Sequence, residues 1–424
     1  MTTWAAPTAT EPVDAVVTVP GSKSMSARAL VLAALAEGPS QIRGGLEARD
    51  TALMRAALRG LGSRVEESDD AWTVTPGWSS GDVTVDCGLA GTVMRFVPPI
   101  AALRDGRTTF DGDEQARQRP VGPVLDGLTA LGVTVERRNG GSLPFGVVGR
   151  GAVRGGEADL DLSGSSQFVS ALLLAGARFD RGLTLRGTGR ATPNRPHITL
   201  TERMLAVHGV AVESSDTADV WHVDPAPVRA HDWVIEPDLS NTTPFFAAAL
   251  VTAGRVRVDG LGTASVQPVS KVADLLTALG ARVEVGQTSV TVNGDGHVDA
   301  VDLDLRDLGE LTPTVVALAL LADGPSRITG IGYLRGHETD RLAALAADAE
   351  QLGGRIDVLD DGLVIHPRPL RAQVWQTYAD HRLATAGAVL GLVVPGVEID
   401  DIAATSKTLP DFAGMWRRML ERAS

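Results

Sequence analysis

Two glycine markers recur along the chain at a spacing of about 70 residues. The first marker follows a helix-like segment and precedes a β-like residue and a charge; it occurs at Gly62, Gly132, Gly209, Gly280 and Gly353. The second follows an apolar helix-like run and precedes a short β-like run; it occurs at Gly38, Gly106, Gly182, Gly254, Gly324 and Gly396. Because two independent markers share one period, the sequence predicts six copies of one structural repeat.

Each repeat has room for two helices and several strands. The glycines of the first marker are predicted to be helix C-caps that lead into a strand. Strands that alternate with helices indicate βαβ units with parallel pairing, and therefore an α/β fold. Two groups of three repeats would form two similar domains, and the repeat count leaves open whether one domain is inserted into the other. The chain ends before the last strand of the sixth repeat, and residues 14–19 are predicted to take that place.

The first helix of each repeat is predicted to begin with small or polar residues. The six N-terminal turns are Ser22-Lys23-Ser24, Gly91-Thr92, Ser165-Ser166-Gln167, Ser240-Asn241-Thr242, Glu310-Leu311-Thr312 and Asp380-His381-Arg382. A helix N-terminus attracts anions through its unpaired N–H groups and its dipole. In the stretch 20–28, Lys23 and Arg28 add positive charge and three serines add hydroxyl donors. The sequence therefore predicts a site for phosphate or carboxylate groups.

The composition of the chain argues against several classes of binding partner and site. The formal net charge of −13 argues against nucleic acid and anionic membrane surfaces, since both require basic faces. The single cysteine, Cys87, excludes an internal disulfide and a multi-cysteine metal site, and we expect it to be a small buried side chain. No metal is expected, because the histidines lack metal-ligand spacing. Residues 1–14 show no leader pattern and no apolar run reaches membrane length, so a cytoplasmic protein is expected.

Seven motifs match one enzyme family in order along nearly the whole chain. They are Gly21-Ser22-Lys23-Ser24-x-Ser26-x-Arg28-Ala29-Leu30, Ala90-Gly91-Thr92-x-Met94-Arg95, Gln118-Arg119-Pro120, Ser165-Ser166-Gln167, His337-Glu338-Thr339-Asp340-Arg341-Leu342, Asp380-His381-Arg382 and Ser406-Lys407-Thr408-x-Pro410-Asp411. In these motifs the chain resembles 5-enolpyruvylshikimate-3-phosphate (EPSP) synthases, the 3-phosphoshikimate 1-carboxyvinyltransferases.

The resemblance implies a fold and a domain order. It implies two similar α/β domains of three βαβαββ repeats each, an inside-out α/β barrel or prism. The first domain would comprise residues 1–20 plus 235–424, and the second residues 21–234. The active site would lie in the cleft between them.

The resemblance also implies an activity. The enzyme would be a transferase that moves the enolpyruvyl group of phosphoenolpyruvate to the 5-hydroxyl of shikimate 3-phosphate and releases phosphate through a tetrahedral intermediate. This step of the shikimate pathway belongs to chorismate and aromatic amino acid biosynthesis. No cofactor is expected, and a cytoplasmic monomer is expected, with the two small molecules as its partners.

Site residues follow from the same resemblance. Expected phosphoenolpyruvate ligands are Lys23, Gly91, Thr92, Arg119, Gln167, Arg341, Arg382 and Lys407. Expected shikimate 3-phosphate ligands are Lys23, Ser24, Arg28, Ser165, Ser166, Gln167, Asn194, Glu310 and His337. Lys23, Glu310 and Glu338 are the catalytic candidates, and the sequence assigns none of them to a particular proton transfer.

Several positions depart from the usual family pattern and leave two alternatives open. The departures are Ala27, Leu89, Asn194, His197, Glu310, Tyr333 and His337. One alternative is UDP-N-acetylglucosamine enolpyruvyl transferase, a related family that usually places a cysteine acid in a mobile loop. The other is a non-catalytic homologue that binds an anionic metabolite. Phosphate release with both substrates present would distinguish these readings.

Overall fold

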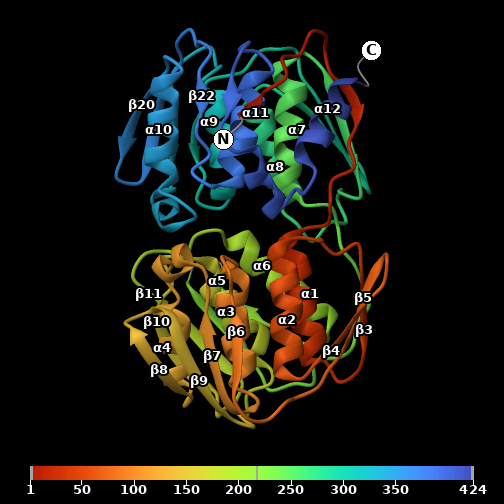
Figure 1. Ribbon diagram of the computed structural model, residues 1–424, viewed down its shortest axis with the longest axis vertical. Helices are drawn as coiled ribbons and strands as arrows, with labels where there is room; N and C mark the ends of the chain where they lie inside the picture. The colour runs from red at the N-terminus through yellow and green to blue at the C-terminus, as the bar shows by residue number, and fades with distance from the viewer. Residues whose placement is uncertain (1–2, 216–217, 422–424) are drawn as a thin grey trace. The chain divides into compact units, whose positions relative to one another are not determined.

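The computed structural model describes residues 3–215 and 218–421. The chain divides into two compact units (Figure 1): unit 1 comprises Met1–Pro20 and Glu236–Ser424, and unit 2 comprises Gly21–Ile235. Each unit is a mixed α/β structure in which small sheets surround helices. The predicted α/β class is therefore confirmed.

Unit 2 contains three repeats in sequence. Its elements are α1 (Lys23–Leu35), β3 (Ser40–Arg43), α2 (Arg49–Leu61), β4 (Arg64–Glu67), β5 (Ala71–Thr75), β6 (Val83–Asp86), α3 (Gly91–Ala101), β7 (Asp105–Asp111), η1 (Glu114–Gln118), α4 (Gly122–Ala130), β8 (Thr134–Asn139), β9 (Ser142–Arg150), β10 (Gly156–Asp161), α5 (Ser166–Gly176), β11 (Leu183–Thr188), α6 (Arg195–Val207), β12 (Glu213–Ser214), β13 (Val220–Val223) and β14 (Trp233–Val234). They form three four-stranded sheets, of order β14-β3-β5-β4, β6-β7-β9-β8 and β10-β11-β13-β12.

Unit 1 repeats this plan. Its elements are β1 (Trp4–Ala5), β2 (Asp14–Val16), α7 (Leu239–Val251), β15 (Arg255–Asp259), α8 (Val269–Ala278), β16 (Arg282–Val285), β17 (Ser289–Asn293), β18 (Asp302–Asp304), η2 (Gly309–Leu311), α9 (Thr312–Ala319), β19 (Ser326–Thr329), η3 (Gly332–Gly336), α10 (Arg341–Gln351), β20 (Arg355–Leu359), β21 (Gly362–His366), β22 (Val374–Trp375), α11 (His381–Gly391), β23 (Glu398–Ile399), η4 (Ile402–Lys407) and α12 (Phe412–Glu421). The sheet orders are β16-β17-β15-β2, β18-β19-β21-β20 and β1-β23-β22.

The four-stranded sheets share one pairing scheme. In the sheet β6-β7-β9-β8, the first strand is parallel to the second, and the two strands that follow the second helix pair antiparallel. A parallel pair requires a crossover connection, which α3 supplies between β6 and β7. Each four-stranded sheet with its two helices is therefore one βαβαββ layer.

The N-terminal strands do not pair as predicted. β2 is parallel to β15 and so takes the first place in the sheet of α7, although it directly precedes α1 in sequence. β14 takes the corresponding place beside β3. The sixth sheet is completed instead by β1, which is antiparallel to β23. The prediction that residues 14–19 fill this sheet was wrong, because the place of a short strand depends on which sheet edge offers unpaired N–H and C=O groups.

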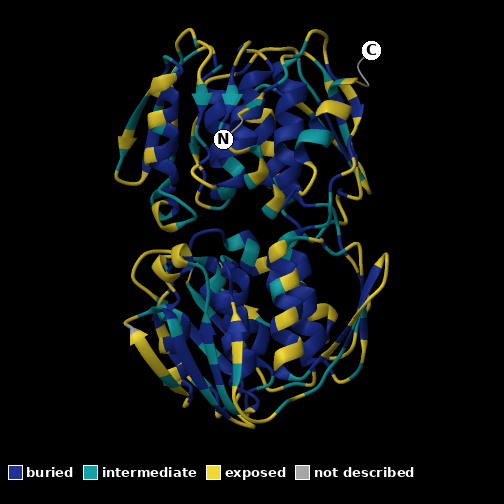
Figure 2. Cartoon of the chain, viewed as in Figure 1, coloured by how far each residue is buried: buried dark blue, intermediate teal, exposed yellow. Residues whose placement is uncertain are grey.

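The first helix of each repeat is central in its unit. In α1, every residue from Met25 to Leu35 is buried, and α3, α5, α7, α9 and α11 are also buried almost throughout (Figure 2). The second helices differ: α2 buries one stripe that includes Met54, Leu58 and Leu61. A helix that is apolar all round belongs in a core, whereas an amphipathic helix covers it.

The glycines of the first marker have the conformation that the repeat predicted. Gly62, Gly132, Gly209, Gly280 and Gly353 have φ values of 112°, 95°, 80°, 101° and 95°. Residues with a side chain rarely adopt this left-handed region, whereas glycine does so freely. These five glycines end a helix and redirect the chain, which explains why they persist through the repeats.

Within residues 3–215 and 218–421, no helix combines the length and the apolar character needed to cross a membrane.

Candidate active site

In unit 2, the predicted residues gather where the first helices begin. Lys23 is the first residue of α1, Gly91 is the first of α3, and Ser166 is the first of α5. Ser22 caps α1 by accepting from the N–H of Met25, and Ser165 caps α5 by accepting from the N–H of Gln167. In α1 and α5 a serine hydroxyl thus replaces a missing backbone partner, whereas α3, which follows Ala90, has no side-chain cap.

Arg28 joins α1 to two other helices of unit 2, α5 and α6. Its guanidinium donates to the Ser24 carbonyl at 3.0 Å, the Ser170 hydroxyl at 3.1 Å and the His197 carbonyl at 3.0 Å, and its Nε donates to Thr201 at 2.7 Å. Arg28 is 2% exposed. These bonds join α1 to α5 and α6, so the predicted ligand Arg28 also holds these three helices together.

A second group joins α3 to α5, and we call Gly91, Arg95, Arg119 and Gln167 the Gly91 cluster. Arg95 donates to Gln167 Oε1 at 2.7 Å and to the Pro120 carbonyl at 3.0 Å. Arg119 donates to the Leu89 carbonyl at 3.0 Å, and its buried Nε has no hydrogen-bond partner in the part of the chain that the structure describes. A methyl group at Gly91 would lie 3.2 Å from both Arg119 Nη2 and Gln167 Oε1.

The remaining predicted residues of unit 2 lie at the starts of α1, α3 and α6. Thr92 is buried in the first turn of α3, and Lys23 Nζ lies 3.7 Å from Asp50 Oδ2. Asn194 is the N-cap of α6, with a left-handed φ of 51°. Asn194 is 6% exposed, and its amide oxygen accepts no hydrogen bond from the residues the structure describes. This buried oxygen can therefore accept a hydrogen bond from a ligand.

In unit 1, acids and cations alternate, and we call Glu310, Glu338, Arg341, Asp380, Arg382 and Lys407 the Arg341 cluster. Glu310 Oε2 accepts from Arg382 Nη2 at 2.6 Å and from the Ser240 hydroxyl at 3.4 Å. Ser240 lies in the first turn of α7, Glu310 lies in η2 just before α9, and Arg382 lies in the first turn of α11. One carboxylate therefore links three helix starts.

Glu338 and Arg341 form the other half of the Arg341 cluster. Glu338 accepts from Lys407 Nζ at 2.7 Å and from Arg341 Nη2 at 3.2 Å. Arg341 Nε donates to Asp380 Oδ2 at 2.7 Å, and Arg341 Nη1 donates to His337 Nδ1 at 3.4 Å. Burial alone would lower the pKa of the Arg341 guanidinium, but Asp380 and Glu338 outweigh burial and raise this pKa. Arg341 is therefore a permanent cation held between carboxylates.

Two residues of these clusters received no role from the sequence. Arg95 donates hydrogen bonds to Gln167 and to the carbonyl of Pro120, directly after Arg119. Its position four residues after Gly91 places both on one face of a helix, and this spacing could have assigned it to the site. Asp380 is fully buried, caps α11 by accepting from the N–H of Arg382, and pairs with Arg341. An aspartate directly before an apolar helical run is a capping signal. Its pairing with Arg341 joins positions 39 residues apart and could not be predicted locally.

Cys87 has the predicted buried position. It is 0% exposed, and burial, followed by the charges of Asp86 and Asp111, raises the pKa of its thiol. A thiol in this setting is a poor proton donor or nucleophile. It therefore gives no support to the alternative family, which usually uses a cysteine acid.

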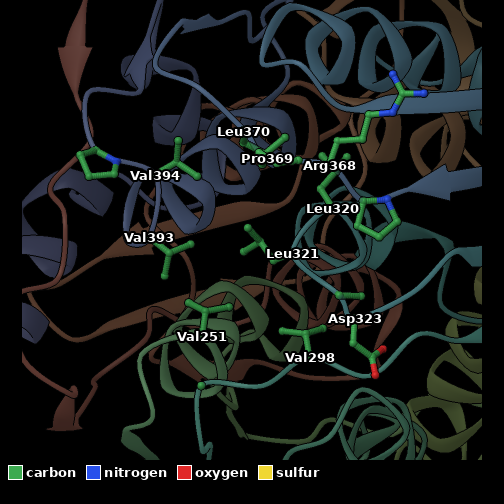
Figure 3. A pocket seen from close by; sticks show the side chains of 14 residues that line it. Val251, Val298, Leu320, Leu321, Asp323, Arg368, Pro369, Leu370, Val393 and Val394 are labelled. Carbon is green, nitrogen blue, oxygen red and sulfur yellow. The ribbon is translucent and has the colours of Figure 1, made fainter.

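A separate cavity of about 590 Å³ lies in unit 1 (Figure 3). Its lining is mostly apolar and includes Val251, Leu321 and Val393, with Asp323 and Arg368 as its charged residues. None of the predicted site residues lines it. The cavity is therefore not the candidate active site.

Comparison with known proteins gives a consistent result. Residues 7–416 match the model of the family described as EPSP synthase (3-phosphoshikimate 1-carboxyvinyltransferase). A solved EPSP synthase from Acinetobacter baumannii is 22% identical, with a TM-score of 0.81 over 98% of this chain and 97% of that chain. The enolpyruvyl transferase NikO from Streptomyces tendae is 20% identical, with a TM-score of 0.76 over 97% of this chain and 96% of that chain. At these identities the two structures show a shared fold.

Proposed function

This chain belongs to the EPSP synthase family, and from that premise we propose how its residues carry out the family's reaction. The enzyme transfers the enolpyruvyl group of phosphoenolpyruvate to shikimate 3-phosphate and releases phosphate, a step of aromatic amino acid biosynthesis. Both substrates are anions. A protein with a net charge of −13 must therefore concentrate its positive charge locally.

The first part of the proposal concerns phosphoenolpyruvate. Its phosphate and carboxylate would be bound by cations of both units, namely Lys23, Arg119, Arg341, Arg382 and Lys407. Gly91, Thr92 and Gln167 would line the same pocket, because the missing side chain at Gly91 leaves space beside Arg119 and Gln167. The observation that supports this proposal is that several predicted residues of each unit lie at the starts of central helices, namely Lys23, Gly91 and Gln167 in unit 2 and Glu310 and Arg382 in unit 1.

The second part concerns shikimate 3-phosphate. Ser165 and Ser166 at the start of α5, with Lys23, Ser24, Arg28, Gln167 and the Asn194 amide, would bind its phosphate and carboxylate. Helix N-terminal N–H groups suit a phosphate. Glu310 and His337 would contact the ring hydroxyls. The buried Asn194 Oδ1 accepts from no donor that the structure describes, so it could accept from a ring hydroxyl, while the Asn194 NH₂ group could donate to the phosphate or carboxylate.

The third part concerns proton transfer. Addition requires the 5-hydroxyl to lose its proton as its oxygen bonds to C2 of the enolpyruvyl group, while the methylene carbon gains a proton. Elimination removes a proton from the resulting methyl group as the bond from C2 to phosphate oxygen breaks. Lys23, Glu310 and Glu338 are the proposed acid and base groups. Their cationic neighbours Arg341, Arg382 and Lys407 would stabilise the anionic tetrahedral intermediate.

Because the proposed ligands come from both units, we expect the complete site to form only when the two units close on substrate. Small-angle scattering with and without shikimate 3-phosphate measures this directly. An unchanged radius of gyration at saturating ligand would contradict it. The monomeric state and the cytoplasmic location remain predictions, which gel filtration and cell fractionation would check.

The deciding experiment is inorganic phosphate release from the purified protein without added metal. Phosphoenolpyruvate is supplied with shikimate 3-phosphate in one reaction and with UDP-N-acetylglucosamine in another. Release with shikimate 3-phosphate alone supports the proposal, and release with UDP-N-acetylglucosamine alone reassigns the acceptor. Release in neither, with binding still seen by calorimetry, favours the non-catalytic homologue.

A matched pair of variants tests the site assignment. Lys407→Met removes a cation of the Arg341 cluster, while Lys271→Met removes one that pairs with Asp307 on the surface of the same unit. We expect the first change to raise KM for phosphoenolpyruvate strongly and the second to leave it unchanged. Equal effects would contradict the assignment.

A further inference from the structure

The segment between β22 and α11 delivers two members of the Arg341 cluster, Asp380 and Arg382. Just before them, Tyr378 and Ala379 have φ values of 51° and 58°. Two consecutive left-handed residues other than glycine are strained and need support from surrounding structure. What holds residues 376–380 therefore also determines where Asp380 and Arg382 lie.

Three hydrogen bonds fix this segment. The N–H of Gln376 donates to Asp348 Oδ1 at 3.3 Å, and the N–H of Thr377 donates to Asp400 Oδ1 at 2.8 Å. The N–H of Asp380 donates to the Thr377 carbonyl at 2.8 Å and closes the turn. Two carboxyl groups from other parts of unit 1 thus hold two consecutive amides.

α10 contacts both ends of the segment. Arg341 at its first position binds Asp380, and Asp348, seven residues later on the same face of the helix, binds the N–H of Gln376. Asp348 is 0% exposed and forms no ion pair with any cation that the structure describes. Its second oxygen, Oδ2, is buried without a hydrogen-bond partner among the described residues, as is the hydroxyl of Thr377.

Burial, and not the hydrogen bond from Gln376, favours the uncharged form of the Asp348 carboxyl group. A buried carboxylate without a cation is strongly unfavourable. Burial raises the pKa of Asp348 to about 7; the hydrogen bond from Gln376 opposes this shift, and the charge of Asp400 adds to it. The Tyr378 phenol also lies in this environment, and its pKa is raised by burial and then by Asp348 and Asp400. The titratable groups that act on Asp348 are therefore Asp400 and Tyr378, and neither supplies a positive charge near pH 7.

We propose that Asp348 is a positioning residue for the enolpyruvyl transfer: by holding the N–H of Gln376, it fixes the left-handed turn that places Asp380 against Arg341 and presents Arg382 to substrate. This inference rests on the proposed function, since it assumes that Arg382 binds phosphoenolpyruvate. Asp348 touches no substrate in this scheme. It acts through the turn and through Asp380, which in turn holds Arg341.

The test compares Asp348→Ala, Asp348→Asn and the control Glu350→Gln. The Asn amide oxygen can accept the same hydrogen bond, whereas Ala cannot, and Glu350 is an exposed acid on the same helix. Hydrogen exchange of a peptide covering residues 374–382 reports on the turn without requiring activity. We expect at least about tenfold faster exchange in Asp348→Ala, and near-unaltered exchange in Asp348→Asn and Glu350→Gln.

Kinetics supply the second readout. We expect Asp348→Ala to raise KM for phosphoenolpyruvate about tenfold with a smaller effect on kcat, and Asp348→Asn to restore KM. Unaltered exchange in a folded Asp348→Ala, or faster exchange with an unaltered KM, would overturn the proposal. If the unaltered chain itself releases no phosphate, the proposed function fails, while the exchange result still shows whether Asp348 holds the turn.

A pH series covers the case in which Asp348→Ala does not fold. In the unaltered chain, ionisation of Asp348 should loosen the segment, so its exchange should rise between pH 6 and 8 beyond the intrinsic rate. Asp348→Asn should lack this extra rise. The same extra rise in Asp348→Asn would overturn the proposal.

Discussion

The Gly91 cluster of unit 2 and the Arg341 cluster of unit 1 both stand at helix starts, but they hold their cations by different means. Arg95 and Arg119 donate to carbonyl and amide oxygens. Arg341, Arg382 and Lys407 bind the carboxylates of Asp380, Glu310 and Glu338. In the Gly91 cluster the arginines are therefore held in position by uncharged partners. In the Arg341 cluster each cation is paired with a carboxylate of opposite charge.

This difference has a functional consequence. Neutral partners leave the positive charge of Arg119 in full for an anionic substrate. The acids of the Arg341 cluster neutralise much of its charge, but two of them, Glu310 and Glu338, are also the proposed proton carriers. We infer that the acids Glu310 and Glu338 of unit 1 mainly supply acid–base chemistry, whereas the cations of both units mainly supply binding. Replacing one of these acids should therefore act mainly on kcat, and replacing a cation in either unit mainly on KM for phosphoenolpyruvate.

The largest expected effect comes from Glu338→Gln, which removes a proton carrier and the partner of Lys407. We expect kcat to fall by about 10²–10⁴-fold, the usual range for a lost general acid or base. Steady-state phosphate release measures this, with Glu350→Gln on the neighbouring helix as control. An effect confined to KM would show that Glu338 is not one of the proton carriers.

The next effect concerns stability and pH in unit 1. Because the folded chain keeps a proton on Asp348 that the unfolded chain releases, this group's contribution to stability is present below about pH 4 and is lost as pH rises through about 7. Asp348→Asn removes this loss. The quantity compared is the free energy of unfolding of Asp348→Asn minus that of the unaltered chain. This difference should be more positive at pH 8 than at pH 4 by up to roughly 3–4 kcal/mol. Urea unfolding of both proteins at several pH values checks this, and parallel pH curves would contradict it.

Gly91→Ala tests whether the Gly91 cluster binds phosphoenolpyruvate. The added methyl group would lie 3.2 Å from Arg119 and Gln167, closer than ordinary contact. We expect KM for phosphoenolpyruvate to rise about tenfold, equivalent to about 1.4 kcal/mol, with a smaller change in kcat. The control is Gly122→Ala, at the first position of α4, where the nearest atom lies at an ordinary 3.5 Å. Equal kinetic effects in both variants would show that the contact with Arg119 is not the cause.

The smallest expected effect comes from Asn194→Gly. Glycine tolerates the left-handed φ of 51°, so the change removes the amide without disturbing the backbone. Loss of one hydrogen bond should raise KM for shikimate 3-phosphate by about 2–10-fold and leave KM for phosphoenolpyruvate unchanged. A larger effect on phosphoenolpyruvate would assign Asn194 to the other substrate.

Much of the fold could be predicted from sequence because the same local signals, helix-ending glycines and small or polar residues at helix starts, recur in successive repeats. The glycines that end helices were identified from spacing alone, and five of them have the required positive φ. The six predicted helix starts all occur, although Glu310 lies in a 3₁₀ turn just before α9 rather than in α9 itself. Capping and glycine chemistry act over a few residues, so a local pattern suffices to reveal them.

The sequence by itself therefore determined the α/β class, the repeats and the residues placed at each helix start. Only the tertiary structure decided that β1, and not β2, completes the sixth sheet, and that Arg341 pairs with Asp380 39 residues away. It also decided that Arg28 and Arg95 bind helices together and that Asp348 is buried beneath the turn before Asp380. These outcomes depend on contacts between residues far apart in the chain. The burial and the electrostatic surroundings of each residue are determined by these distant neighbours, which a local sequence pattern does not identify.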